Sequence, residues 1–326
     1  MHAVIRGSRE QVSDDGAEIL HAEELDEDSS PVAEAFERTT LELSKNKIVK
    51  DVWQRATRKP LPISTTDGFV TRFEIQFARI VSDDESQSSK KYVVYDVTCR
   101  QDTNTQEDKS TATIEKRYTD FLTLYEALKK ENSQLLSNVA FPGKKILGNF
   151  TSDLISERAL AFENFLDYII SVPALRDSPS FLSFLQDDDL NKAARQIDER
   201  RNELAVPILE AIFLLLNKVY LDKSRPVLLL LCRLVAACTS SPIPHPSSVK
   251  WTELALRRFD HVSDTEILVL YIPLLNTASF LFWQKGLDTK LINNRLEEMG
   301  RKGIKIKDTL TLMQSLHTIE PRSETF

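Results

Sequence analysis

The stretch TATIEKRYTDF, residues 111–121, contains the change of spacing that decides the fold. Its first part, Thr111–Lys116, has the composition of a short β-strand. From Asp120 onward the spacing is helical, because apolar residues follow at positions i, i+3, i+4 and i+7 of one helix face. These residues are Phe121, Leu124, Tyr125 and Leu128. The sequence therefore predicts a strand that passes directly into a helix, with Arg117 and Tyr118 at the junction.

This junction has the chemistry of an anion-binding site. The N-terminus of a helix already favours a phosphate, and Arg117 would direct its guanidinium fork toward it. Tyr118 beside it offers a flat face that can cover a sugar-like ring. Phe121 begins the apolar stripe of the helix, so we expect it to anchor the junction in the core.

Two longer strands are predicted before the junction. Apolar and polar residues alternate in Phe69–Val81, and Lys91–Cys99 is rich in β-branched and aromatic residues. The acidic, serine-rich segment Ser82–Ser89 between them is predicted to be a loop. Because the connections are short, these two segments and Thr111–Lys116 predict a three-stranded meander.

A loop and a second helix are predicted after the first helix. The loop covers Ser137–Phe150 and is broken by Pro142-Gly143. Ser152 is the predicted N-cap of the second helix, which continues to Ser171 at helical spacing. Pro179–Leu185 is then predicted to close the first domain.

Three parts of this region together resemble a PX domain, over Asp67–Asp187. RYTDF (residues 117–121) resembles the R-[RY]-x-x-F signature of that family. FPGKK (residues 141–145) resembles its proline-rich loop ending in a lysine, although phenylalanine stands where many PX domains carry a second proline. SERAL (residues 156–160) resembles the segment that carries the later arginine of the family. The implied fold is α+β, a three-stranded antiparallel meander with helices.

The resemblance also implies a role for each basic residue. By position, Arg117 would bind the 3-phosphate of an inositol headgroup, and Tyr118 would pack on the inositol ring. Lys144 would meet the 1-phosphate, and Arg158 would hydrogen-bond the 4- and 5-hydroxyls. Lys145 competes with Lys144, and the spacing within the loop favours Lys144.

Ile146 and Leu147 follow these lysines and are the predicted membrane-insertion residues of the loop. Burying such a side chain in lipid would add roughly 1.5–3 kcal/mol. The alternative is that both residues pack under the loop, and that Lys144 and Lys145 are only solvated.

The two arginines also have ordinary structural interpretations. Arg117 could form a surface ion pair with Asp120 or Glu115. Arg158 could pair with a glutamate of its own helix, such as Glu163. The structure has to decide between these pairs and a free site.

After the acidic run at residues 187–189 the sequence predicts only helices. They cover about Asn191–Asn202, Leu204–Leu221, Pro226–Thr239, Ser247–His261, Asp264–Gln284, Lys290–Met299 and Lys307–Leu316. Antiparallel helix pairs in a bundle or short solenoid are the natural packing, although no fixed repeat period is present. A PX domain followed by such a module resembles a small subgroup of sorting nexins with a TPR-like interaction domain. The predicted organisation is an acidic disordered tail and linker (1–67), a PX domain (68–187) and a helical TPR-like interaction domain (190–326).

Composition excludes several classes of protein. The 326 residues carry a formal net charge of −7, which argues against a general nucleic-acid binder. Two apolar segments, Ala205–Leu216 and Val227–Cys238, fall short of the roughly 20 residues a membrane span requires and are predicted to be core helices. The N-terminus lacks the apolar stretch of a secretory signal, so we expect a cytoplasmic protein. Neither a catalytic motif nor metal-ligand spacing is present, and we expect no enzyme activity, cofactor or metal.

These observations lead to one hypothesis and one alternative. The hypothesis is a peripheral adaptor on the cytoplasmic face of the early endosome that binds phosphatidylinositol 3-phosphate. Its helical part, residues 190–326, would bind a protein such as a receptor cytoplasmic tail. The alternative is a protein scaffold whose PX fold binds lipid weakly or not at all.

Overall fold

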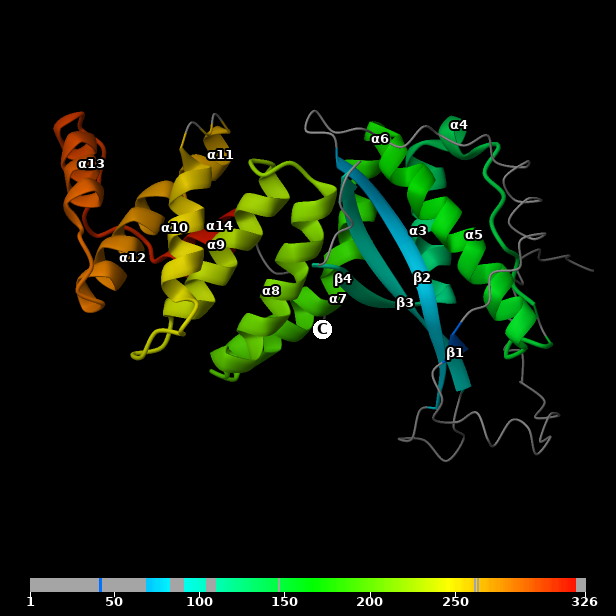
Figure 1. Cartoon of the computed structure of the whole chain (residues 1–326). Helices are drawn as coiled ribbons and strands as arrows, with labels where there is room; N and C mark the ends of the chain where they lie inside the picture. The colour runs from blue at the N-terminus through cyan, green and yellow to red at the C-terminus, as the bar shows by residue number, and fades with distance from the viewer. Residues whose placement is uncertain are drawn as a thin grey trace, which may run out of the picture. The chain divides into compact units, whose positions relative to one another are not determined.

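The computed structural model of the chain describes residues 41–42, 69–82, 91–103, 110–145, 147–260, 262 and 264–320. Within these residues an antiparallel sheet comes first and a succession of helices follows (Figure 1). The predicted loop at residues 83–89 and most of the predicted tail lie outside the described residues.

The sheet has the order β1-β2-β3-β4, and every neighbouring pair is antiparallel. Its strands are β1 (Leu41–Glu42), β2 (Phe69–Ser82), β3 (Lys91–Thr103) and β4 (Ala112–Arg117). The predicted three-stranded meander is thus confirmed as β2, β3 and β4. The prediction of only a tail and linker over residues 1–67 does not hold at β1, which pairs with Ala78 and Phe77 of β2.

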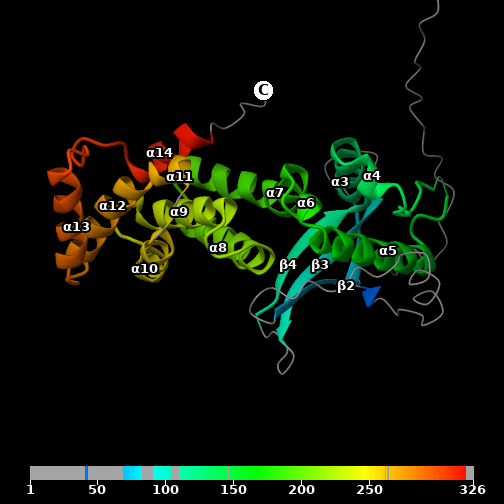
Figure 2. The ribbon, with the colours of Figure 1, turned by 90° about the horizontal axis from the view of Figure 1, so that it is seen from above.

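Five helices follow the sheet in the described chain (Figure 2). An aromatic cluster joins α3 and α5 to the sheet. They are α3 (Tyr118–Glu131), α4 (Ser133–Leu136), α5 (Ser152–Ser171), α6 (Pro173–Arg176) and α7 (Pro179–Asp198). Phe121 of α3 and Phe162 of α5 stack with ring centroids 3.8 Å apart, and both contact Tyr95 of β3 edge-on. All three side chains are fully buried. As predicted, Phe121 anchors the strand–helix junction in the core.

Two carboxylates of α5 hold β2 against that helix. Asp167 accepts the backbone N–H of Phe73 at 3.1 Å, and Glu163 accepts that of Ile75 at 2.6 Å. The register between β2 and β3 shifts between Ile75 and Phe77, as at a β-bulge. The two carboxylates accept hydrogen bonds from backbone N–H groups of β2 next to this shift. Helix α5 begins at Ser152, so its N-cap is Thr151 and the predicted N-cap Ser152 is one residue too late.

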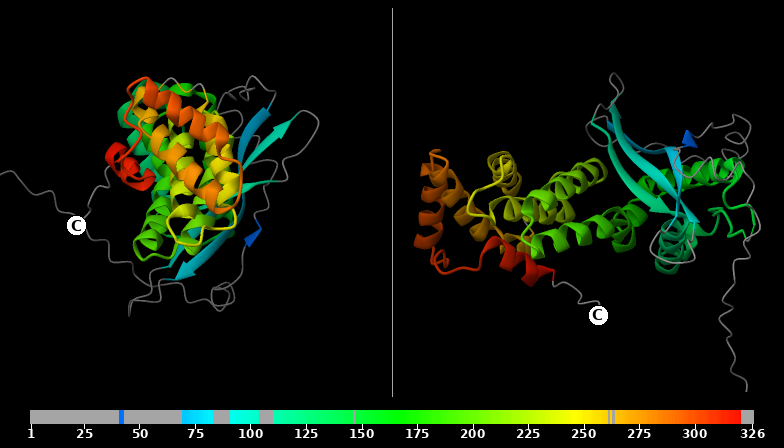
Figure 3. Two further views of the ribbon diagram at one scale, coloured as in Figure 1. Left: turned by 90° about the vertical axis from the view of Figure 1, so that its left-hand side faces the viewer. Right: turned by 90° about the horizontal axis from the view of Figure 1, so that it is seen from below.

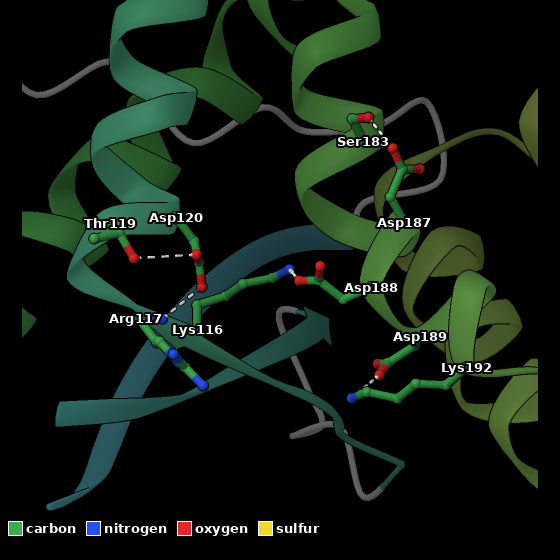
Figure 4. A network of polar contacts seen from close by, with 9 residues as sticks. All are labelled: Lys116, Arg117, Thr119, Asp120, Ser183, Asp187, Asp188, Asp189 and Lys192. Carbon is green, nitrogen blue, oxygen red and sulfur yellow. Dashed lines mark hydrogen bonds and ion pairs between the residues drawn. The ribbon is translucent and has the colours of Figure 1, made fainter. Parts of the chain in front are cut away.

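Helix α7 runs through the predicted boundary between the two domains. Pro179 occupies its first turn, and the hydroxyl of Ser178 accepts the N–H of Phe181 as an N-cap. The acidic run at residues 187–189 lies inside the helix, and Asp188 pairs with the buried Lys116 of β4 at 2.5 Å (Figure 4). The prediction of a separate helix at Asn191–Asn202 is therefore wrong, because one helix runs from Pro179 to Asp198. The division into two domains stays a prediction.

The rest of the chain is helical, as predicted (Figure 3). The helices are α8 (Asn202–Val219), α9 (Arg225–Thr239), α10 (Ser248–Phe259), α11 (Thr265–Leu268), α12 (Tyr271–Gln284), α13 (Lys290–Arg301) and α14 (Leu312–Ile319). Helices α7 to α10 pack in sequence order, and α14 returns to contact α9. Besides Asn191–Asn202, two predicted helices need correction. Asp264–Gln284 is divided in two, and Lys307–Leu316 begins only at Leu312, after Asp308 adopts a positive φ of 50°.

One apolar core continues from the sheet to α14. Polar contacts add to it: Thr71 of β2 donates to the carbonyl of Lys218 in α8, and Tyr220 donates to the carbonyl of Arg176. We refer below to residues 69–187 as the PX half and to residues 190–320 as the helical half. The two halves therefore share one core.

The two apolar segments weighed as membrane spans are core helices, as predicted. Ala205–Leu216 lies in α8 and Val227–Cys238 in α9, and most of their apolar side chains are buried. In the part of the chain that the structure describes, one stretch, Thr265–Gln284, is long and apolar enough to cross a membrane. Half of it is buried, and a core helix of a soluble protein meets the same criterion, so length and composition alone do not indicate a span.

Candidate functional site

Arg117 ends β4 and stands immediately before α3. Its backbone N–H donates to Asp120 Oδ2 at 2.7 Å, which fixes the start of the helix. Its guanidinium lies over the ring of Tyr92, 3.5 Å from the centroid. Figure 4 shows the side chain directed away from Asp120, while neighbouring Lys116 extends toward α7. The last two residues of β4 thus have different environments, because Lys116 is buried against α7 and Arg117 is exposed at the surface.

The predicted surface ion pairs of Arg117 do not form. Asp120 accepts the backbone N–H instead, and Glu115 pairs with Arg79 at 2.6 Å. Among the described residues, no carboxylate lies within ion-pair distance of the Arg117 guanidinium. The charge is exposed and held in place by an aromatic ring, an arrangement that leaves its donors open to an anion.

Arg158 of α5 lies over the ring of Tyr118, 4.3 Å from the centroid. Its side chain is buried, with 4% of the residue exposed, and Nε has no hydrogen-bond partner among the described residues. Burial raises the pKa of the neighbouring Tyr95 to about 12, an effect that the charge of Arg158 and its hydrogen bonding to Tyr95 oppose. Among the described residues no ion pair joins Arg158 to Glu163, and Glu163 accepts the backbone N–H of Ile75. A buried guanidinium nitrogen without a hydrogen bond is costly unless a ligand completes it.

Tyr118 ties these groups to the predicted basic loop. Its hydroxyl donates to the carbonyl of Pro142 at 2.9 Å, and burial raises its pKa. Phe141, the departure from the family pattern, stacks on Tyr125 at 4.7 Å and contacts Tyr118 at 6.1 Å. The phenylalanine therefore does what a rigid proline would do, because it anchors the start of the loop.

Lys144 and Lys145 follow in the same loop, and both are exposed. Neither has an ion pair within the described ranges, and the carbonyl of Lys145 accepts from Asn149 at 3.0 Å. Leu147 is 79% exposed, so the alternative that it packs under the loop is wrong. Ile146 lies outside the described residues.

The structure brings Tyr118, Arg158 and the loop carrying Lys144 and Lys145 together, with Arg117 adjacent. The roles assigned to the individual residues stay predictions. Sequence reasoning missed Tyr92, which supports Arg117. The register of β3 and β4 would have identified it. Val94 pairs with Arg117, so Tyr92, two residues before Val94, is a diagonal neighbour of Arg117 on the same face of the sheet.

The site is a cluster of cations on an aromatic platform, and it suits a ligand with several negative charges. Within the described ranges, no group of three or more His, Cys, Asp or Glu side chains is placed to hold a metal ion.

Comparisons with known proteins identify the family of this part of the chain. The family model of the PX domain matches residues 104–188. The chain is 31% identical to sorting nexin-20 from Bos taurus over 69% of this chain and 68% of the relative. It is 27% identical to sorting nexin-21 from Homo sapiens over 71% of this chain and 60% of the relative. The crystal structure of the mouse SNX19 PX domain with bound sulphate ion covers 36% of this chain and 96% of its own, with 23% identity and a TM-score of 0.29.

Proposed function

We propose that this chain, which belongs to the sorting nexin family and carries its PX domain, is a phosphoinositide-binding adaptor of endosomal trafficking. One observation carries the proposal. Two arginines that lack carboxylate partners within the described residues, Arg117 exposed and Arg158 buried, lie beside Tyr118 and a loop with two free lysines. A folded protein tolerates such uncompensated charge where a polyanionic ligand binds.

The headgroup we propose is phosphatidylinositol 3-phosphate. The exposed guanidinium of Arg117 would take the 3-phosphate, and Lys144 the phosphate that links the ring to glycerol. Nε of Arg158 is oriented from a buried position, which suits hydroxyls of the ring better than a further phosphate. Each charge-assisted hydrogen bond contributes about 1.5–3 kcal/mol, so a few of them give reversible binding.

The adjoining loop would insert apolar side chains into the bilayer in addition to binding the headgroup. Leu147 is almost wholly exposed, and Phe150 is 44% exposed. Burying such side chains in lipid adds roughly 1.5–3 kcal/mol apiece. The chain as a whole is acidic, so its attraction to an anionic membrane has to come from this local patch. We therefore place the protein on the cytoplasmic face of the endosomal membrane, as a peripheral protein.

Vesicle sedimentation of the full chain tests the proposal. Wild-type protein is expected to bind phosphatidylcholine vesicles that contain phosphatidylinositol 3-phosphate and to stay free of vesicles without it. Arg117→Ala and Arg158→Met should each weaken binding about 10- to 100-fold, since each removes at least one charge-assisted hydrogen bond. Arg195→Ala is the matched control, because Arg195 is exposed on α7 and far along the chain from the site.

Two outcomes would contradict the proposal in different ways. If wild-type protein does not sediment with any phosphoinositide vesicle, the chain is a scaffold whose PX fold has no lipid ligand. If wild type binds and Arg117→Ala and Arg158→Met bind equally well, another surface of the molecule binds the membrane.

We also propose that the helical half recruits a protein, such as the cytoplasmic tail of a receptor. Its two exposed large aromatic residues support this assignment, with Trp283 at 71% and Phe280 at 64%. Exposed aromatic side chains of this size are typical of protein interfaces.

A further inference from the structure

An open groove lies between α12 and α13, helices that neighbour one another in the fold (Figures 1 and 3). Its volume is about 340 Å³, enough for one or two side chains of a ligand. Phe280 and Trp283 of α12 line one side, with ring centroids 6.1 Å apart, and Asn293 and Leu296 of α13 line the other. The groove is therefore concave and aromatic, and it presents amides as well as rings.

The helix that supplies these rings carries no charge. Tyr271–Gln284 reads YIPLLNTASFLFWQ, without a single acidic or basic residue. An exposed helix face of a soluble protein is normally charged. Depletion of charge together with enrichment of aromatic residues marks the centre of a protein interface. Because Phe280 and Trp283 are exposed, this face of α12 has the composition of such a centre with no cover in the described chain.

Lysines stand at both ends of the groove. Lys285 and Lys290 flank the end near Trp283 and Thr289. At the other end Asn276 donates to the carbonyl of Ile306 at 3.2 Å, which brings Lys305 and Lys307 beside it. These four lysines form no ion pair with the rest of the described chain.

Two acidic residues, Asp288 and Asp308, lie close in sequence to these four lysines. The six residues together therefore carry a net charge of +2. The whole chain, in contrast, carries −7. The rim of the groove is thus basic in an acidic protein. Opposite charge on a partner would accelerate its approach and fix its register.

We propose that the groove between α12 and α13 binds an acidic peptide segment of another protein, anchored by an aromatic or aliphatic side chain between Phe280 and Trp283. This proposal rests on the proposed recruitment of a protein by the helical half, and it names the binding site and the chemistry of the ligand. Acidic residues on either side of the anchor would meet the lysines at the two ends.

A lipid surface is the competing occupant, because lysines around exposed aromatic rings also suit an anionic membrane. The geometry favours the peptide. A bilayer favours a wholly apolar surface, whereas the wall of the groove opposite Phe280 and Trp283 carries the polar Asn293. The Asn293 amide accepts from Ser279 and donates to Thr289, and its second N–H and second lone pair can still hydrogen-bond a peptide backbone, which lipid tails cannot do.

Selection from a phage-displayed library of random peptides against the full chain tests the proposal. The enriched peptides should combine an aromatic or leucine anchor with flanking Asp and Glu. A synthetic consensus peptide should then bind the wild-type chain, measured by fluorescence anisotropy, and lose affinity as salt rises. Trp283→Ala should weaken binding at least about tenfold, as expected for an interface hot spot. The double substitution Lys285→Glu and Lys290→Glu should weaken it as well.

Leu221→Ala is the matched control, since Leu221 is 70% exposed in the helical half and lies outside the groove. It should bind the peptide like wild type, and circular dichroism should show that all variants are folded. If the peptide binds Trp283→Ala as tightly as wild type, recruitment stands but this groove is not its site. If no peptide is enriched, both the groove and peptide recruitment fail. If Trp283→Ala instead loses binding to phosphatidylserine vesicles that lack phosphoinositide, the occupant is a membrane and the peptide proposal is overturned.

Discussion

The candidate sites of the PX half and the helical half differ in the kind of side chain at their centre. Within the described residues of the PX half, Arg117 lacks an ion pair and Arg158 Nε lacks a hydrogen bond. In the helical half Phe280 and Trp283 lack cover. A folded chain normally pairs the first kind and buries the second. The contrast is our basis for assigning an anionic ligand to one half and a peptide with an apolar anchor to the other.

The contrast is confined to the surface, because the interior is shared. The core continues from the sheet into α14, and α7 belongs to both halves. We therefore expect the halves to differ in what they bind and to unfold together.

The largest expected effect tests that shared interior. Phe162→Ala removes a ring stacked 3.8 Å from Phe121 and should lower the free energy of unfolding by about 3–5 kcal/mol. In a background with Trp53→Phe and Trp283→Phe, the fluorescence of Trp251, buried in α10, reports on the helical half. Its urea midpoint should fall together with the far-ultraviolet circular dichroism.

Phe280→Ala is the control, since Phe280 is 64% exposed and its loss should change stability by less than about 0.5 kcal/mol. If the Trp251 midpoint does not move in Phe162→Ala while circular dichroism shows an earlier transition, the two halves are independent domains. The organisation predicted from sequence would then be right after all.

The next largest expected effect is a dependence of the free energy of unfolding on pH, caused by Asp167 in the PX half. Burial raises the pKa of Asp167 to about 7, an effect that the N–H of Phe73 and Arg72 oppose and Glu163 and Glu74 reinforce. In the unfolded chain the carboxyl ionises near about pH 4, so between there and about pH 7 unfolding releases a proton. The free energy of unfolding should fall as pH rises through that window, by up to about 1.4 kcal/mol per pH unit.

Asp167→Asn keeps an oxygen that can accept the N–H of Phe73 but does not titrate. Urea denaturation of wild type and variant at about pH 5 and about pH 8 should show a smaller loss of stability in the variant. Equal losses in the two proteins would mean that this carboxyl is not the source.

The sequence is informative where the decisive contacts are local. Arg117 and Tyr118 are consecutive, and the spacing on either side identifies the strand and the helix they join. Helical periodicity likewise predicts α8, α9 and α10. In these segments the apolar positions that pattern the chain are the ones that the fold buries.

Long-range contacts account for the rest. The sequence places a helix start at Asn191, yet α7 begins at Pro179 and carries Asp188, whose partner Lys116 is distant in sequence. The stack of Arg117 on Tyr92 depends on strand register. The return of α14 to α9 joins segments far apart in sequence, and no local spacing encodes it.

The smallest effect we predict concerns Tyr92, which we infer to position Arg117. Tyr92→Ala should weaken vesicle binding about two- to fivefold, because a cation–π contact at an exposed site is worth about 0.5–1 kcal/mol. Tyr92→Phe keeps the ring and should bind like wild type. If phenylalanine fails as alanine does, the hydroxyl itself contacts the ligand. If alanine binds like wild type, the stack contributes nothing. Binding of the acidic peptide should be unchanged in both variants, since the two halves share a core but not a ligand.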